Sequence, residues 1–223
     1  MIKQVIIGLA TEGSTDTRFL ESIVRRTFED VALECSESIE IFDLVPLEKS
    51  SGSSRSIEEK ALDYAEKANL SGVMILCFHV DADNKTDDRA FKERVNPAFE
   101  AIIKSDEELY KNLIAIVPIQ MTEAWMLADK ELLKSELGTL KNDEELGINK
   151  KPETFADPKK IIEESIQIVR QELSKRRRYQ LKIDDLYQPI GQKINLQKLD
   201  TLSSYSKFKE AVRETFRKLN YLR

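Results

Sequence analysis

Residues 73–83, which read VMILCFHVDAD, form an apolar run that ends in a D-x-D pair. An apolar run of this length, bounded by glycine and polar residues, is typical of a strand that is buried on both faces of a parallel sheet. Residues 4–16, which read QVIIGLATEGSTD, have the same arrangement, because an apolar run is followed there by Glu12 and Asp16. The two stretches therefore predict two buried strands with acidic residues at their carboxyl ends.

Segments typical of strands and of helices alternate along the chain up to residue 119. Repeated strand–helix units of this kind predict a parallel sheet with right-handed crossovers. We expect an α/β fold that is Rossmann-like: a mostly parallel sheet of about four strands flanked by helices, followed by a helical C-terminal extension. The expected strands are residues 4–9, 39–44, 73–80 and 113–119, and the expected helices are residues 15–29, 57–68 and 88–104.

The pattern changes after the fourth expected strand. A helix is expected to begin near residue 121, and a polar connector follows over residues 139–158. Further helices are expected at residues 158–176 and 204–219. We therefore expect residues 1–130 to form the first domain and residues 131–223 to form a basic, mainly helical extension.

The charge of the chain is divided unevenly. Residues 1–150 contain 18 Lys and Arg against 30 Asp and Glu, a net charge of −12, whereas residues 151–223 contain 17 against 10, a net charge of +7. The basic part includes the run Lys175, Arg176, Arg177 and Arg178. Such a run is either a footprint for nucleic acid or a solvated helix end, where cations are favoured by the helix dipole.

Composition places the chain among globular proteins. Of its 223 residues, 41% are hydrophobic and 34% are charged, and no apolar stretch approaches the roughly 20 residues that a membrane span requires. The amino terminus has neither a charged leader nor a small-residue cleavage site. Cys35 and Cys77 have no paired spacing, which is typical of reduced thiols. We expect a cytoplasmic protein that does not enter a membrane.

Four carboxylates are expected at one edge of the sheet. Glu12 and Asp16 follow the first strand, and Asp81 and Asp83 follow the third. They converge if these strands are neighbours and if the backbone between the two aspartates is extended, since ligands bind at the carboxyl ends of parallel strands. Carboxylates this close repel one another unless a cation lies between them. Oxygen ligands favour magnesium, manganese or calcium ions.

The chain contains a single histidine, His79. A catalytic zinc site usually needs several His or Cys ligands, and a Ser-His-Asp triad needs a histidine near a nucleophile. Both classes of site are therefore disfavoured. His79 itself is either a structural residue of the strand or a residue that orients a ligand or transfers a proton.

Three segments resemble motifs of small Toprim-like proteins of prokaryotic defence systems, including the nuclease part of OLD-type proteins. Residues 8–20, GLATEGSTDTRFL, resemble the first motif of these proteins, and residues 79–83, HVDAD, resemble their D-x-D motif. Residues 121–125, MTEAW, resemble a later segment in some of them. The resemblance covers residues 4–130 and implies that the first domain is a Toprim-like catalytic domain.

The resemblance also implies a ligand set and an activity. Glu12, Asp16, Asp81 and Asp83 would bind two divalent ions, Mg²⁺ or Mn²⁺, and Glu123 would be a further catalytic acid. The catalytic lysine of such nucleases has no clear counterpart, and Lys85 and Lys159 are both candidates. The implied activity is metal-dependent hydrolysis of phosphodiester bonds in nucleic acid, with DNA as the expected substrate, in phage or plasmid defence or in DNA processing. The residues expected to bind the nucleic acid are Lys159, Lys175, Arg176, Arg177 and Arg178.

Other interpretations of the same residues stay open. Small relatives of this type often occur with ATPases, so the chain could be a non-catalytic regulatory or binding subunit beside an ATPase partner; a homo-oligomer is also compatible with the sequence. A strand ending in D-x-D also occurs in haloacid-dehalogenase-like phosphatases and in nucleotide-sugar glycosyltransferases, although the former place it on the first strand. Trp125 is either a core residue or a platform for base stacking.

Overall fold

The computed structural model describes residues 3–48, 56–105, 109, 111–172 and 181–222. Its centre is a parallel four-stranded sheet with the strand order β4-β2-β5-β6. The strands β1 and β3 form a second, two-stranded parallel sheet. The strands are β1 (Lys3–Val5), β2 (Ile7–Ala10), β3 (Ile39–Ile41), β4 (Val45–Leu47), β5 (Ile75–His79) and β6 (Leu113–Ile116).

The order of the strands reverses between β2 and β5. From β2 the chain continues to β4 on one side, whereas β5 continues to β6 on the other. Leu9 of β2 lies opposite Cys77 of β5, and Ala10 lies opposite Phe78. The loops that follow β2 and β5 therefore begin next to each other, at the type of switch point where open α/β sheets bind ligands.

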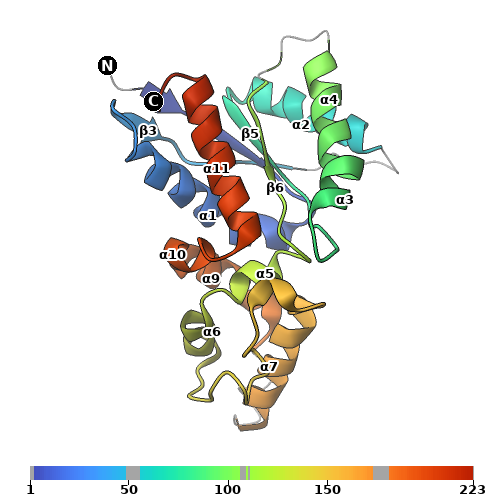
Figure 1. Ribbon diagram of the computed structural model, residues 1–223, viewed down its shortest axis with the longest axis vertical. Helices are drawn as coiled ribbons and strands as arrows, with labels where there is room; N and C mark the ends of the chain where they lie inside the picture. Colours follow the sequence, from blue (N-terminus) through green and yellow to red (C-terminus); the bar gives the residue numbers. More distant parts are fainter. Residues whose placement is uncertain (1–2, 49–55, 106–108, 110, 173–180, 223) are drawn as a thin grey trace.

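Helices cover both faces of the sheet (Figure 1). The helices α1 (Ser14–Ala32) and α11 (Ser203–Lys218) cover one face, and α2 (Ile57–Leu70), α3 (Asp88–Ala90) and α4 (Asn96–Lys104) cover the other. Side chains of β5 alternate between the two layers, so Cys77 packs with α1 and Phe78 packs with α2 and α4. This architecture confirms the expected α/β fold class.

The C-terminal helices do not stand apart from the sheet. In Figure 1, α11 runs alongside the sheet, while α5, α6 and α7 lie beyond the carboxyl ends of the strands. Phe216 of α11 packs edge-to-face on Phe28 of α1, with ring centroids 5.8 Å apart, so both halves of the chain contribute to one core. The helices in this part are α5 (Glu123–Met126), α6 (Lys130–Leu137), α7 (Pro158–Glu172), α9 (Tyr187–Lys193) and α10 (Leu196–Leu199).

Local details differ from the sequence expectations. The expected strand 4–9 is divided into β1 and β2, which pair with different partners. The expected strand 39–44 is shortened to β3, and β4, which follows it, was not expected. Pro46 lies in β4, an edge strand, where the missing N–H of proline is tolerated. The expected helix 88–104 contains the π-helical segment η1 (Phe91–Val95). None of the helices within the described ranges is both long and apolar enough to cross a membrane.

Ion pairs join the acidic and basic parts of the chain. Arg213 of α11 binds Glu34 at 2.7 Å, and Lys209 binds Asp30 at 2.8 Å. Lys207 binds the buried carboxylate of Asp87 at 2.7 Å. Part of the positive charge of the C-terminal region is therefore paired with acidic residues of the first half of the chain. The run Lys175, Arg176, Arg177 and Arg178 lies outside the described residues.

A close helix contact fixes α9 against α1. A Cβ atom on Gly191 would lie 2.3 Å from the backbone oxygen of Phe19, so only glycine fits this contact. Arg26 of α1 strengthens it by donating hydrogen bonds to the carbonyl oxygens of Gly191 (2.7 Å) and Ile194 (2.8 Å), which satisfies the C-terminal end of α9.

We expect Gly191→Ala to destabilise the protein, although the same change inside an exposed helix stabilises it by about 1 kcal/mol. The reason is overpacking against the Phe19 backbone, which costs roughly 1–3 kcal/mol. Chemical denaturation measures the difference. Gln192→Ala, at an exposed neighbouring position, is the matched control and should not lower the free energy of unfolding; an equally stable Gly191→Ala variant would contradict the close contact.

Candidate metal centre

The loop after β2 turns tightly into α1. Thr11 Oγ1 donates a hydrogen bond to the Gly13 carbonyl oxygen (3.0 Å) and is hydrogen-bonded to Thr17 Oγ1 (2.7 Å). Gly13 is the last residue before α1, so Asp16 lies in the first helical turn. A carboxylate is favoured there by the helix dipole. The loop thus positions Asp16 at the carboxyl edge of the sheet.

Asp81, after β5, is held in one orientation. Its Oδ1 accepts hydrogen bonds from Thr122 N (2.8 Å) and Thr122 Oγ1 (3.1 Å), and His79 Nε2 lies 3.3 Å from the same oxygen. His79 Nε2 is also 3.0 Å from Thr122 Oγ1. Thr122 lies in the segment after β6, so the end of β5 and the segment after β6 together fix this carboxylate.

Ligand atoms of Asp16, His79 and Asp81 all lie within 4.8 Å of one another. His79 is buried, and its Nδ1 has no hydrogen-bond partner among the described residues. A buried polar atom without a partner is uncommon in folded proteins. Two carboxylates and one imidazole are donors that suit a divalent cation, with manganese or another transition ion favoured if the imidazole binds directly.

Glu12 and Asp83 lie beside this cluster and share a cation from the chain. Arg94 Nη1 is 3.3 Å from Glu12 Oε1, and Arg94 Nη2 is 3.3 Å from Asp83 Oδ2. Arg94 Nη2 also donates a hydrogen bond to the backbone carbonyl of Asp81. The structure therefore brings the four predicted acids to one edge of the sheet, but in two groups.

The expected extended backbone between the two aspartates is wrong at Asp83, which has a φ of 50°. The loops after β5 and β6 are hydrogen-bonded to each other there: Asp83 N donates to the Gln120 carbonyl (2.8 Å), and Gln120 N donates to the Asn84 carbonyl (3.0 Å). These bonds turn the chain at Asp83. The two aspartates consequently meet different partners, Asp81 with His79 and Asp83 with Arg94.

The acids of the cluster are held at an electrostatic cost. Burial raises the pKa of Asp16, and the charge of Asp81 raises it further, against the lowering effect of His79. Burial likewise raises the pKa of Glu12, although His79 and Arg94 offset part of this rise. Burial alone would lower the pKa of His79, but its hydrogen bond to Asp81 and the surrounding carboxylates raise it overall. The cluster has an excess of negative charge that a bound cation would relieve.

Glu123 is joined to the C-terminal region. It is a buried residue at the start of α5, and its Oε1 accepts a hydrogen bond from the hydroxyl of Tyr187 in α9. Burial raises the pKa of Glu123, while the bond from Tyr187 and the charge of Lys159 lower it in part. Asp81 also raises this pKa, so Glu123 lies near the candidate metal centre, and Lys159 lies near Glu123.

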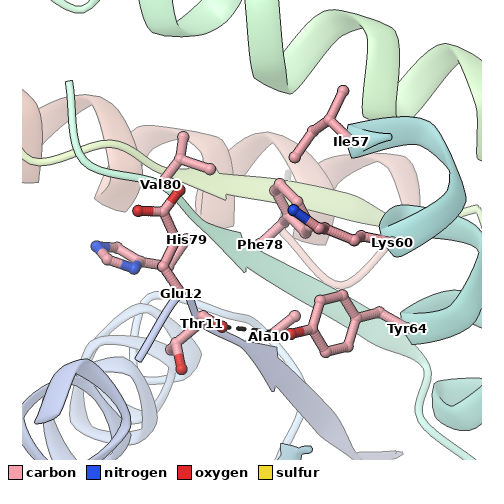
Figure 2. Close-up of a pocket in the computed structure, with 9 residues that line it drawn as sticks. All are labelled: Ala10, Thr11, Glu12, Ile57, Lys60, Tyr64, Phe78, His79 and Val80. Atoms are coloured by element: carbon pink, nitrogen blue, oxygen red, sulfur yellow. Dashed lines mark hydrogen bonds between the residues drawn. The ribbon is translucent and has the colours of Figure 1, made fainter. Parts of the chain in front are cut away.

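A cavity of about 250 Å³ opens beside Glu12, on the α2 side of the sheet. Figure 2 shows Lys60 and Tyr64 reaching from α2 toward the ends of β2 and β5, where Glu12 and His79 lie. The Tyr64 hydroxyl donates a hydrogen bond to the Thr11 carbonyl (3.3 Å), which joins α2 to the loop after β2. Lys60 forms no ion pair with any carboxylate in the described ranges.

Two other sequence candidates lie elsewhere. Lys85 is exposed after the D-x-D pair. Trp125 is fully buried; its Nε1 donates to Ser204 Oγ (2.8 Å), and its ring packs edge-to-face on Tyr205 with centroids 5.3 Å apart. The core interpretation of Trp125 is confirmed, and base stacking on its ring is excluded by its burial.

Four residues of the site were not predicted from the sequence, and for three of them no local signal exists. Arg94 and Lys60 are ordinary basic residues of helical segments, and Tyr187 is 64 positions from the carboxylate that it binds. Thr122 does lie in the MTEAW segment, next to Glu123. Its position beyond the carboxyl end of the expected strand 113–119 could have indicated a hydrogen-bond donor to the site.

Comparison with protein-family models places the chain in a family. The profile of a family described as "Domain of unknown function (DUF4276)" matches residues 11–210, which include the whole candidate metal centre. No curated protein and no solved structure matches significantly.

We expect Asp16→Asn to stabilise the metal-free protein at pH 7. The pKa of Asp16 is higher in the folded protein than in the unfolded chain. The free energy of unfolding therefore falls as the pH rises from the unfolded-state pKa through the folded-state pKa, because the carboxylate ionises more readily in the unfolded chain. The cost is about 1.4 kcal/mol for each unit of the rise, or a few °C in the unfolding midpoint. The amide does not titrate, so the advantage should shrink below about pH 4.

Thermal unfolding in EDTA at both pH values measures this effect. Glu21→Gln, at an exposed position of the same helix, controls for the loss of one negative charge and should show a smaller change. An Asp16→Asn variant that is less stable than the wild type at pH 7 would show that the carboxylate is not held against repulsion.

Proposed function

The chain belongs to the DUF4276 family, and we propose that it is a divalent-metal-dependent phosphodiesterase that cleaves nucleic acid. The observation that carries the proposal is the convergence of Asp16, His79 and Asp81 within 4.8 Å at the switch point of a parallel sheet. Glu12 lies beside them with a raised pKa. Clustered acids of this kind are costly to fold, and binding a cation is the use that fits their chemistry.

The roles of the residues follow from their contacts. Asp16 and Asp81 would hold the ion, and His79 would either bind the ion or orient Asp81. Glu12 would add a further negative charge beside the ion. Thr122 keeps Asp81 in place through two hydrogen bonds. A bound divalent ion would supply positive charge for a phosphoryl oxygen and would lower the pKa of a coordinated water.

Glu123 is suited to proton transfer. Its carboxyl group is buried with a raised pKa, close to Asp81, and Tyr187 fixes its orientation. A carboxyl group whose pKa is shifted toward neutrality can both take up and release a proton during a reaction. In this proposal Glu123 exchanges a proton with the attacking water or with the leaving oxygen.

Basic residues around the acids support a phosphate-containing substrate. Arg94 and Lys60 lie on the α2 side of the centre, and Lys159 lies near Glu123 on the other. Cations at these positions would neutralise charge on a phosphate during transfer. The preference for DNA, the link to phage or plasmid defence and an ATPase partner rest on the Toprim resemblance of residues 4–130, whereas the proposed cytoplasmic location rests on the unpaired spacing of Cys35 and Cys77.

The direct test is cleavage of single-stranded, duplex and supercoiled DNA, and of RNA, with Mg²⁺ or Mn²⁺. We expect metal-dependent cleavage by the wild type and a loss of at least about 100-fold with Asp81→Asn, because the variant loses a ligand carboxylate. Asp88→Asn removes an exposed acid near the same loop and is the matched control; it should cleave at the wild-type rate.

Three outcomes would argue against the proposal. Equal cleavage by the wild type and by Asp81→Asn would indicate a contaminating nuclease. Binding of the ion without cleavage of any substrate would favour a metal-binding regulatory subunit. Hydrolysis of phosphomonoesters in place of nucleic acid would favour the phosphoryl-transfer alternative.

The cavity makes a separate prediction about nucleic-acid binding. In EDTA, Lys60→Met should weaken binding of a labelled single-stranded oligonucleotide. The negative slope of log K against log salt should become shallower by about 0.7, the value for one lost phosphate contact. Fluorescence anisotropy over a salt series measures the slope. Lys104→Met, at the far end of α4 where Lys104 pairs with Glu100, should leave it unchanged, and an unchanged slope in Lys60→Met would remove Lys60 from the binding surface.

A further inference from the structure

Arg94 occupies the middle of the acids that surround the candidate metal centre. Its guanidinium group contacts Glu12 and Asp83, each at 3.3 Å, and donates to the backbone carbonyl of Asp81. Only 26% of the side chain is exposed. The three contacts come from both acidic loops, so Arg94 joins the segment after β2 to the segment after β5.

Two departures from regular backbone bring this arrangement about. Arg94 lies in η1, a π-helical segment within the helix that follows the second acidic loop. Such segments are rare and occur frequently at functional sites. Asp83 has a φ of 50°, a conformation that is uncommon for residues other than glycine. One irregularity is therefore at each partner of the Arg94–Asp83 ion pair.

The contacts divide the acids into two sets of different charge. Asp16 and Asp81 face His79 and have no cationic partner of fixed charge among the described residues, whereas Glu12 and Asp83 are both paired with Arg94. A guanidinium group stays protonated under all ordinary conditions. A second divalent ion placed between Glu12 and Asp83 would therefore be repelled by Arg94.

We propose that Arg94 takes the place of a second cation, so that the centre binds one divalent ion per chain. This inference rests on the proposed function, and it replaces the two ions implied by the Toprim resemblance with one ion and one guanidinium group. The ion is held on the side of Asp16 and Asp81. Arg94 holds Glu12 and Asp83 and provides the positive charge on the opposite side of the centre, where its planar group also suits a phosphate oxygen.

The number of ions is measurable without any enzymatic assay. Equilibrium dialysis with Mn²⁺ gives the stoichiometry, and electron paramagnetic resonance distinguishes an isolated Mn²⁺ from a coupled pair. We expect one isolated Mn²⁺ for the wild type and for Arg94→Lys, which keeps the positive charge. Arg94→Met removes the charge and should bind a second Mn²⁺, and Arg94→Met/Asp83→Asn should return to one.

Arg89→Met is the matched control, because Arg89 is an exposed arginine of the same helical region that pairs with Glu93; it should bind one ion. Two ions in the wild type would overturn the role of Arg94 and leave the proposed metal centre intact. No Mn²⁺ binding by the wild type would overturn the metal centre itself, and with it this inference. A single ion in a folded Arg94→Met protein would also overturn the inference, with circular dichroism as the check on folding.

Discussion

The parallel pairing of β2 with β5 is the contact on which the candidate site depends. It sets Leu9 against Cys77 and so starts two loops, one carrying Glu12 and Asp16 and the other carrying the D-x-D pair, at neighbouring points. Strand order reverses at this pair, so no crossover helix covers the gap between the loops. Helices bury β5 on both faces, and its pairing with β2 sets the register that places the two loops side by side. Convergence of the acids is thus a consequence of sheet topology.

Gathering negative charge at one edge has a cost, and the rest of the chain limits it. Arg94 pairs with both Glu12 and Asp83 and offsets part of their charge, while Tyr187 donates a hydrogen bond to the buried carboxylate of Glu123. Even so, the pKa of Asp16 is raised, as expected for a half-buried carboxylate beside another carboxylate. Sites that keep such a cost are commonly functional, because selection for stability alone would replace the acids.

The C-terminal region contributes to the site as well as to the core. Its helices α9 and α11 pack on α1 and β6, and Tyr187 and Lys159 approach Glu123 from this side. Several of its basic residues are bound by acids of the first half of the chain, as Arg213 is by Glu34. The charge asymmetry of the sequence therefore reflects internal ion pairing at least in part, and the phosphate-binding role proposed here falls on Lys60, Arg94 and Lys159.

The sequence by itself determined the α/β class, the parallel sheet and the positions of the acidic loops, because apolar runs and helical periodicity are local signals of burial. Of the two roles that the sequence allowed for Trp125, core packing and base stacking, the structure shows core packing. Only the tertiary structure decided that Asp81 and Asp83 have different partners, since loop-to-loop hydrogen bonds turn the chain at Asp83. The same holds for Arg94 and Tyr187: each reaches its carboxylate across a large sequence separation, and a contact of this kind depends on packing that no local pattern encodes.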